Sequence, residues 1–314
     1  MQDNYSDSAA PTQFINSETT FPPVIKTWEA YLTDQKKSIY TVRAFKGDLQ
    51  LFASYFSPDK TIGSVSTKDI SNFLDWMNNE RQVPCSPKTL SRRITAIKSF
   101  FKWLHQFGVI EEDPAGPIDQ ISVASPIPEV LTREEYERGL AAADAYRVSR
   151  KPDARNSLLF RLLISTGIKK SETLGISKNH IERDDPENPR LFVRYANGEN
   201  RSKERTIALP ADILPVLDEY LDQYKPSDKI FPWSPRRLEY LLEDIGSDAG
   251  LTKHLSFAMC RWTCIVKDYA EGVSVDVIRD KMGVSQVQWR DVISKLKVLE
   301  PVYKGELTAE EAQE

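Results

Sequence analysis

A proline-rich stretch in the first half of the chain is the feature that most restricts the fold. Residues 111–130, EEDPAGPIDQISVASPIPEV, hold four prolines together with glycine and serine. Such a composition interrupts helices and favours an extended linker. The chain has 314 residues, which is long for one core and suits two domains. We therefore expect one domain over residues 23–118, a linker over 119–129 and a second domain over 130–303.

Before this linker, apolar residues recur at the spacing of helices. Two stripes with steps of three or four residues are Ile39, Val42, Phe45, Leu49 and Phe52 and, later, Leu90, Ile94, Ile97, Phe101 and Leu104. Amphipathic helices have this periodicity on their buried face, so we expect a bundle of four or five helices. The polar residues 1–22 are expected to form a disordered arm.

The region after the linker predicts helices interrupted by a short β-structure. Thr132 and Glu135 have the spacing of a capping box, which starts a helix. Apolar residues alternate over 191–195, Asn197 and Gly198 follow, and a second apolar run covers 206–209, which together indicate a β-hairpin. The expected fold class is therefore mainly α with a small hairpin or sheet, ending in an acidic tail over 304–314.

Positive charge is concentrated in the first expected domain. The whole chain has a formal net charge of −4, whereas residues 26–118 carry 13 Lys and Arg against 10 Asp and Glu. On the helix expected over 86–107, the side away from the apolar stripe carries Lys88, Arg92, Arg93, Lys98 and Lys102. No acid lies between Lys88 and Gly108, and like charges on one helix are destabilising unless something neutralises them. This surface is either an ordinary solvated face or a phosphate-binding face.

Several site classes lack a sequence signal. The cysteines Cys85, Cys260 and Cys264 are odd in number, which indicates a reducing compartment and no disulfide framework. Cys260 and Cys264 lie four apart, but no histidine has a matching spacing, so we expect no metal and no cofactor. No signal peptide is visible, and no apolar run reaches the roughly 20 residues of a membrane span. We expect a cytoplasmic protein.

Five segments in order resemble the tyrosine recombinase (phage integrase, Xer-type) family. They are TLSRRITAIKSFFKWLHQFGVIEEDPAGPI, STGIKKSETLGI, NGENRSKERTIAL, HLSFAMCRWTC and VIRDKMGVSQVQW. The resemblance covers about residues 24–303 and implies a helical, SAM-like core-binding domain followed by an integrase catalytic-type domain. In this family a tyrosine attacks a DNA phosphorus, while arginines, a lysine and histidines stabilise charge and transfer protons.

The resemblance implies a site without an intact catalytic set. The family's first arginine falls on Lys169, its lysine on Asn200, its histidine on Ala258 and its second arginine on Arg261. A later position that is usually histidine or tryptophan falls on Val284, and the tyrosine falls on Ile293. Only Arg261 keeps the family's residue. Arg201 or Lys203 is an alternative for the lysine position, His254 for the acid–base role, and Tyr303 for a displaced nucleophile.

The resulting hypothesis is a catalytically inactive, nucleoid-associated protein that clamps duplex DNA in an architectural, regulatory or accessory role. Self-association or pairing with related recombinase subunits is an expected property. The candidate DNA contacts are Lys36, Lys37, Thr41, Arg43, Lys46, Lys88, Arg92, Arg93, Lys98, Lys102, Lys169, Arg201, Lys203, Arg205 and Arg261. Two alternatives remain open: an active site-specific recombinase or integrase that uses a displaced nucleophile, and a protein-interaction module that does not bind DNA.

Overall fold

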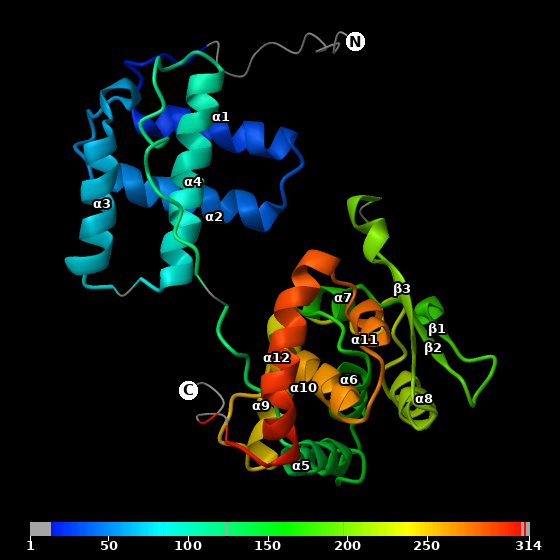
Figure 1. Ribbon diagram of the computed structural model, residues 1–314. Helices are drawn as coiled ribbons and strands as arrows, with labels where there is room; N and C mark the ends of the chain where they lie inside the picture. Colours follow the sequence, from blue (N-terminus) through cyan, green and yellow to red (C-terminus); the bar gives the residue numbers. More distant parts are fainter. Residues whose placement is uncertain (1–13, 84, 124, 197, 309–310, 312–314) are drawn as a thin grey trace. The chain divides into compact units, whose positions relative to one another are not determined.

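The computed structural model describes residues 14–83, 85–123, 125–196, 198–308 and 311, and it divides the chain into a first unit up to Ser125 and a second unit from Pro126 (Figure 1). The first unit contains α1 (Phe21–Asp34), α2 (Ile39–Ser54), the 3-10 turn η1 (Ile62–Ser64), α3 (Thr67–Asn79) and α4 (Pro87–Gln106). The second contains α5 (Arg133–Ala145), α6 (Arg155–Thr166), α7 (Lys170–Gly175), η2 (Lys178–His180), β1 (Ile181–Glu182), β2 (Arg190–Val193), η3 (Gly198–Lys203), β3 (Arg205–Ala208), α8 (Ile213–Tyr224), α9 (Pro235–Asp248), α10 (Phe257–Ala270), α11 (Val275–Met282) and α12 (Gln286–Lys304).

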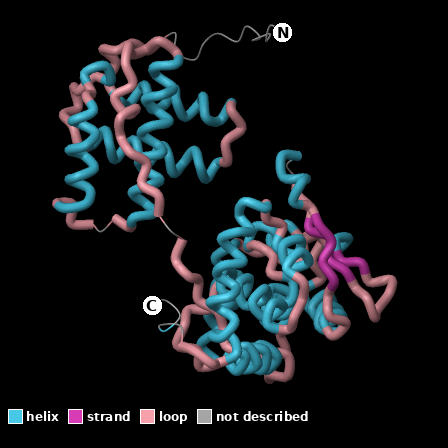
Figure 2. The backbone as a smooth tube through the Cα atoms, viewed as in Figure 1, coloured by secondary structure: helices cyan, strands magenta, loops and turns pink. Residues whose placement is uncertain are grey.

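The predicted fold class is confirmed. The first unit is a helical bundle and the second is mainly helical with one small sheet (Figure 2). The capping box of Thr132 and Glu135 starts α5, as predicted. None of the helices in the described ranges has the length and apolar character that a membrane crossing requires.

Aromatic side chains form much of the core of the first unit. The ring of Phe52 lies 5.6 Å from that of Phe21 and 5.0 Å from that of Phe73, measured between centroids, in edge-on contacts. Because Phe21 is buried here and begins α1, the prediction of a disordered arm is wrong for residues 14–22. Residues 1–13 lie outside the described residues.

A buried carboxylate on α2 joins this helix to α4. Oδ1 of Asp48 accepts hydrogen bonds from Nη2 of Arg92 at 2.9 Å and from Nε of Arg93 at 3.3 Å. Only 4% of the Asp48 side chain is exposed. Burial raises the pKa of Asp48, and the two guanidinium groups offset part of this effect. The charges of Arg92 and Arg93, on a helix that has no acid between Lys88 and Gly108, are therefore neutralised by an acid from another helix.

Lys98 is also engaged within the first unit. Its ammonium group donates to the backbone carbonyls of Ala115, Gly116 and Ile118, in the segment that follows α4. Residues 119–121, which the sequence assigned to the linker, are also held against α4, since the hydroxyl of Ser91 donates to the carbonyl of Ile121 at 2.7 Å.

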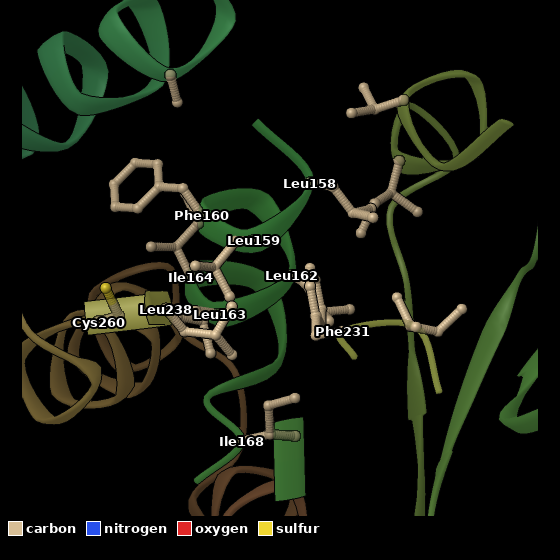
Figure 3. Close-up of a cluster of buried hydrophobic side chains, with 14 of the residues drawn as sticks. Leu158, Leu159, Phe160, Leu162, Leu163, Ile164, Ile168, Phe231, Leu238 and Cys260 are labelled. Carbon is tan, nitrogen blue, oxygen red and sulfur yellow. The ribbon is translucent and has the colours of Figure 1, made fainter. Parts of the chain in front are cut away.

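Helix α6 lies at the centre of the second unit. Its leucines, phenylalanine and isoleucine point in several directions and are almost fully buried, together with Phe231, Leu238 and Cys260 from other segments (Figure 3). A helix whose apolar side chains point in several directions is stable only when protein covers most of its surface. Gly167 ends α6 in the left-handed conformation, and α10 packs against both α6 and α12. This arrangement brings the α6–α7 turn next to α10.

The sheet is antiparallel with the strand order β1-β2-β3. The predicted hairpin is present, with Leu191 opposite Ile207. Asn197, at the predicted turn, lies outside the described residues, and Gly198 starts the 3-10 turn η3. The sequence analysis missed β1, which has only two residues and is too short for an alternating pattern.

Replacing Asp48 by alanine is expected to destabilise the protein by roughly 3 kcal/mol, because Arg93 would remain largely buried without its acidic partner. The measurement is the free energy of unfolding of the Asp48→Ala variant in urea, with Asp75→Ala on the exposed side of α3 as the control. A loss below about 1 kcal/mol, as for ordinary surface substitutions, would show that the Asp48 pair does not hold α2 and α4 together.

Candidate functional site

Three of the family positions line one cavity of the second unit. The cavity has a volume of about 410 Å³, and its walls include Lys169, Ala258, Arg261, His254 and Ser256. Lys169 immediately precedes α7, whereas Ala258 and Arg261 lie on α10. The α6–α7 turn and α10 therefore bring together the positions that the sequence analysis assigned to two arginines and a histidine.

The guanidinium group of Arg261 is bound to the protein's own backbone. Nη1 donates to the carbonyl of Gly167, and Nη2 donates to the carbonyl of Met282 at 2.8 Å. Burial lowers the pKa of Arg261 from its usual value, yet a guanidinium group stays charged in proteins. Arg261 thus joins the end of α6 to the end of α11 through α10.

A second arginine is held by a buried acid that the sequence analysis did not single out. Nη1 and Nη2 of Arg205 lie 3.1 and 3.0 Å from the two carboxylate oxygens of Glu172, and the side chains are 9% and 1% exposed. The hydroxyl of Tyr195 also donates to Glu172. Burial alone would raise the pKa of Glu172, but the hydrogen bonds and charge of Arg205 hold it at about 2.

The contacts of Arg205 and Arg261 supply hydrogen-bond donors to the C-terminus of α11. Its last four carbonyls all accept hydrogen bonds: those of Arg279 and Asp280 from the amide of Gly283, that of Lys281 from Nε of Arg205, and that of Met282 from Arg261. Such carbonyls have no partner inside their own helix, and cations are stabilising at this negative end. The two arginines therefore act as capping groups for α11.

Lys169 is the cation with the loosest contact in this cavity. Its ammonium group lies 3.8 Å from Glu172, and 39% of the side chain is exposed. Burial lowers the pKa of Lys169; Glu172 opposes this effect, while Arg261, Arg205 and Lys203 add to it. Because other cations lie close to it, Lys169 is suited to bind an anion, but its ammonium group lacks the two-point grip of a guanidinium group.

The position expected for the nucleophile has no reactive atom. Ile293 is half-buried on α12 and packs against the hydrophobic cluster formed by α10, α11 and α12. Tyr303, ten residues later on the same helix, is 1% exposed in that cluster, and its ring lies under the guanidinium group of Arg133 at 5.9 Å. Burial raises the pKa of Tyr303 above its usual value. Neither residue presents a hydroxyl to the cavity of Lys169 and Arg261.

The lysine position falls in η3, at the tip of the hairpin. Nζ of Lys203 donates to Oδ1 of Asn200 at 2.8 Å, and Arg201 is exposed. Lys203 and Arg205 line a different cavity, of about 550 Å³, with Val284. The structure therefore places Lys169, Ala258 and Arg261 in one cavity and Val284 in another, while Asn200 and Ile293 line neither of the two. The guanidinium group of Arg205 is paired with Glu172, and this pairing disfavours a direct contact between Arg205 and a phosphate.

The candidate DNA contacts of the first unit differ in their availability. Arg43, Lys88 and Lys102 are exposed, as are Lys36 and Lys37 between α1 and α2.

Other candidates of this unit have partners inside it. Lys46 forms an ion pair with Glu29 at 2.7 Å, and the backbone amide of Thr41 donates to Ser38 as part of the N-cap of α2. Arg92 keeps 42% of its side chain exposed beside Asp48.

The buried cysteines have a plain structural role. Cys260 and Cys264 are free thiols in the interior, and burial raises the pKa of Cys264 to about 11. Over the described ranges, no group of His, Cys, Asp and Glu side chains has the geometry of a metal site.

Two family models match the chain. One, described as phage integrase, N-terminal SAM-like domain, covers residues 25–108, and the other, phage integrase family, covers residues 129–289. A tyrosine recombinase of Thermosipho africanus is 26% identical over 269 residues, which cover 83% of this chain and 90% of that protein.

Solved structures agree in fold. A XerH site-specific recombinase in a post-cleavage complex with a palindromic difH substrate has a TM-score of 0.69 at 18% identity, covering 90% of this chain and 85% of that one. Lambda integrase residues 75–356 bound to DNA have a TM-score of 0.63 at 14% identity, covering 87% and 96%.

Replacing Arg261 by methionine is expected to lower the free energy of unfolding by roughly 2–3 kcal/mol, because two carbonyls lose a charged donor. Arg261→Lys should be nearly as destabilising, since one ammonium group cannot reproduce the planar fork that serves two separate carbonyls. Urea unfolding measures the free energy of unfolding of both variants, with Arg290→Met on the exposed side of α12 as the control. Wild-type stability of Arg261→Lys would mean that only the charge matters.

Stability is also expected to depend on pH through Glu172. Its pKa is about 2 in the folded protein against an ordinary 4.5, so its contribution is complete above pH 4.5 and is lost as pH falls towards 2. The shift corresponds to about 3 kcal/mol. The stability difference between wild type and Glu172→Gln should therefore shrink between pH 5 and pH 3, unlike that of the exposed Glu187→Gln. A constant difference over this range would contradict the assignment.

Proposed function

Because the chain belongs to the phage integrase family, we propose that it binds duplex DNA with both units and does not cleave it, in an architectural, regulatory or accessory role. The observation that carries the absence of cleavage is the residue at the nucleophile position, Ile293. The family's chemistry forms a covalent bond between a tyrosine oxygen and a DNA phosphorus, and isoleucine has no atom that replaces it.

The geometry of Tyr303 supports the same proposal. Ten residues separate it from Ile293 on α12, which corresponds to roughly 15 Å along a helix. Its ring is buried and its pKa is raised, whereas a nucleophile needs access to the phosphorus and an activated oxygen. The loss of a histidine at Ala258 removes an acid–base group as well.

DNA binding requires less than catalysis, namely exposed cations on surfaces that can follow a phosphate backbone. Arg43 on α2 and Lys88 and Lys102 on α4 are exposed in the first unit. In the second unit, Lys169 faces the cavity of Arg261, and Arg201 and Lys203 stand at the hairpin tip. The DNA-bound lambda integrase of similar fold supports duplex DNA as the partner. Lys98, Arg93 and Arg205 are left out, because their charged groups are bound within the protein.

The expected result is salt-sensitive binding of duplex DNA without a covalent adduct. Each phosphate contact contributes about −0.9 to the slope of log K against log salt, so the double variant Arg43→Gln, Lys88→Gln should reduce the slope by about two. Lys68→Gln, exposed on α3, is the matched control and should leave the slope unchanged. Fluorescence anisotropy over a salt series gives these slopes.

Cleavage is tested separately with a nicked duplex that traps covalent complexes on a denaturing gel. No adduct is expected. An adduct that disappears in Tyr303→Phe would establish the displaced nucleophile and overturn the proposal. Binding that is absent, or that does not weaken as salt rises, would instead favour a protein-interaction module.

A further inference from the structure

The segment after α4 is folded back along this helix. Figure 1 shows the chain returning beside α4, and the hydrogen bond from Ser91 to the carbonyl of Ile121 fixes the far end of this return. Ser91 lies in the second turn of α4, which ends at Gln106. At 1.5 Å per residue, the chain comes back roughly 20 Å towards the start of the helix before it leaves the first unit. We call residues 113–121 the strap.

Side chains of α3 and α4 hold the strap by its backbone. Lys98 places one ammonium group, with three N–H donors, against the three carbonyls of residues 115, 116 and 118. The hydroxyl of Thr67 donates to the carbonyl of Pro114 at 2.8 Å. Gln120 donates to the hydroxyl of Ser91 at 3.0 Å. The strap is therefore fixed at its beginning, middle and end.

We propose that the strap sets the free length of the linker between the two units, and that Lys98 is its main anchor. Val130 is fully buried in the second unit, where its carbonyl accepts a hydrogen bond from Lys253. Ile127 also packs against the hydrophobic cluster of the second unit, so with the strap in place residues 122–126 connect the two units. Without it, the connection is residues 113–126, nearly three times as long. The strap thus keeps the units on a short tether.

A short tether strengthens binding when both units contact one duplex, a consequence that rests on the proposed function. The effective concentration of the second unit falls roughly as the −3/2 power of linker length, so a connection nearly three times as long costs about fivefold in affinity. This effect requires no new contact with DNA. It differs in kind from a phosphate contact by Lys98, which would change the salt slope by about one.

The experiment compares Lys98→Met and Ser91→Ala with wild type and with the exposed Lys68→Met control. The amides of Ala115, Gly116 and Ile118 donate hydrogen bonds inside the strap, so their hydrogen exchange reports whether it is held. Hydrogen exchange at these amides should be at least tenfold faster in Lys98→Met. It should be moderately faster in Ser91→Ala, a substitution that leaves the charge of the protein unchanged. The DNA affinity of Lys98→Met should fall about fivefold with an unchanged salt slope.

Exchange rates at these three amides equal to those of wild type in both variants would overturn the proposal. A salt slope reduced by about one in Lys98→Met would also overturn it, because that change indicates a direct phosphate contact by Lys98. If exchange rises throughout α1–α3 in Lys98→Met, the fold is affected and Ser91→Ala decides the question. Wild-type protein that does not bind DNA would contradict the proposed function, while the exchange result would still decide whether the strap is held.

Discussion

The buried contact between Glu172 and Arg205 is the interaction on which the architecture around the candidate site depends. It joins the start of α7 to β3, and Arg205 also reaches the end of α11 through Nε. Burying two charges is unfavourable unless every donor and acceptor finds a partner. Here the hydroxyl of Tyr195 and the backbone amide of Lys169 also donate hydrogen bonds to the Glu172 carboxylate. Arg261 then joins the same end of α11 to the α6–α7 turn.

This network gives Arg261 a structural role that does not depend on the residues at the other family positions. In the family the second arginine serves the phosphate. In this chain the ends of two helices occupy two of its five N–H donors, because Gly167 at the end of α6 and Met282 at the end of α11 each accept one hydrogen bond. A helix terminus presents partial negative charge and needs donors, so the carbonyls of α11 are a natural intramolecular counterpart. The requirement for a guanidinium group at position 261 therefore follows from the fold alone, independent of any reaction.

The sequence predicted features that depend on near neighbours and missed those that depend on distant ones. The helix starting at the Thr132 capping box and the β-hairpin follow from local patterns, and the structure has them. The partner of Arg92 and Arg93 is Asp48, more than forty residues earlier, so inspection of α4 alone suggested unpaired cations. Glu172 was missed because a single acid in STGIKKSETLGI has no periodic signal. Its position three residues after Lys169 is nevertheless that of a capping-box acid, whose carboxylate accepts a hydrogen bond from the backbone amide at the start of the helix. The carbonyls that Arg261 contacts belong to turns that are brought together only by tertiary packing.

Binding and catalysis respond differently to the loss of residues, and this difference is the reason for proposing DNA binding without cleavage. Under this proposal, Ile293 and Ala258 stand where the family's chemistry needs a tyrosine oxygen and an acid–base group, and additional cations replace neither of them. The proposed affinity for DNA is instead a sum of many weak contributions from side chains on α2, α4 and the hairpin. The internal contacts of Arg93, Lys98 and Arg205 remove a few of these contributions, yet they fix the helices that carry the others. In general, a few substitutions remove such chemistry, whereas a surface that binds DNA is lost only when many of its cations are replaced.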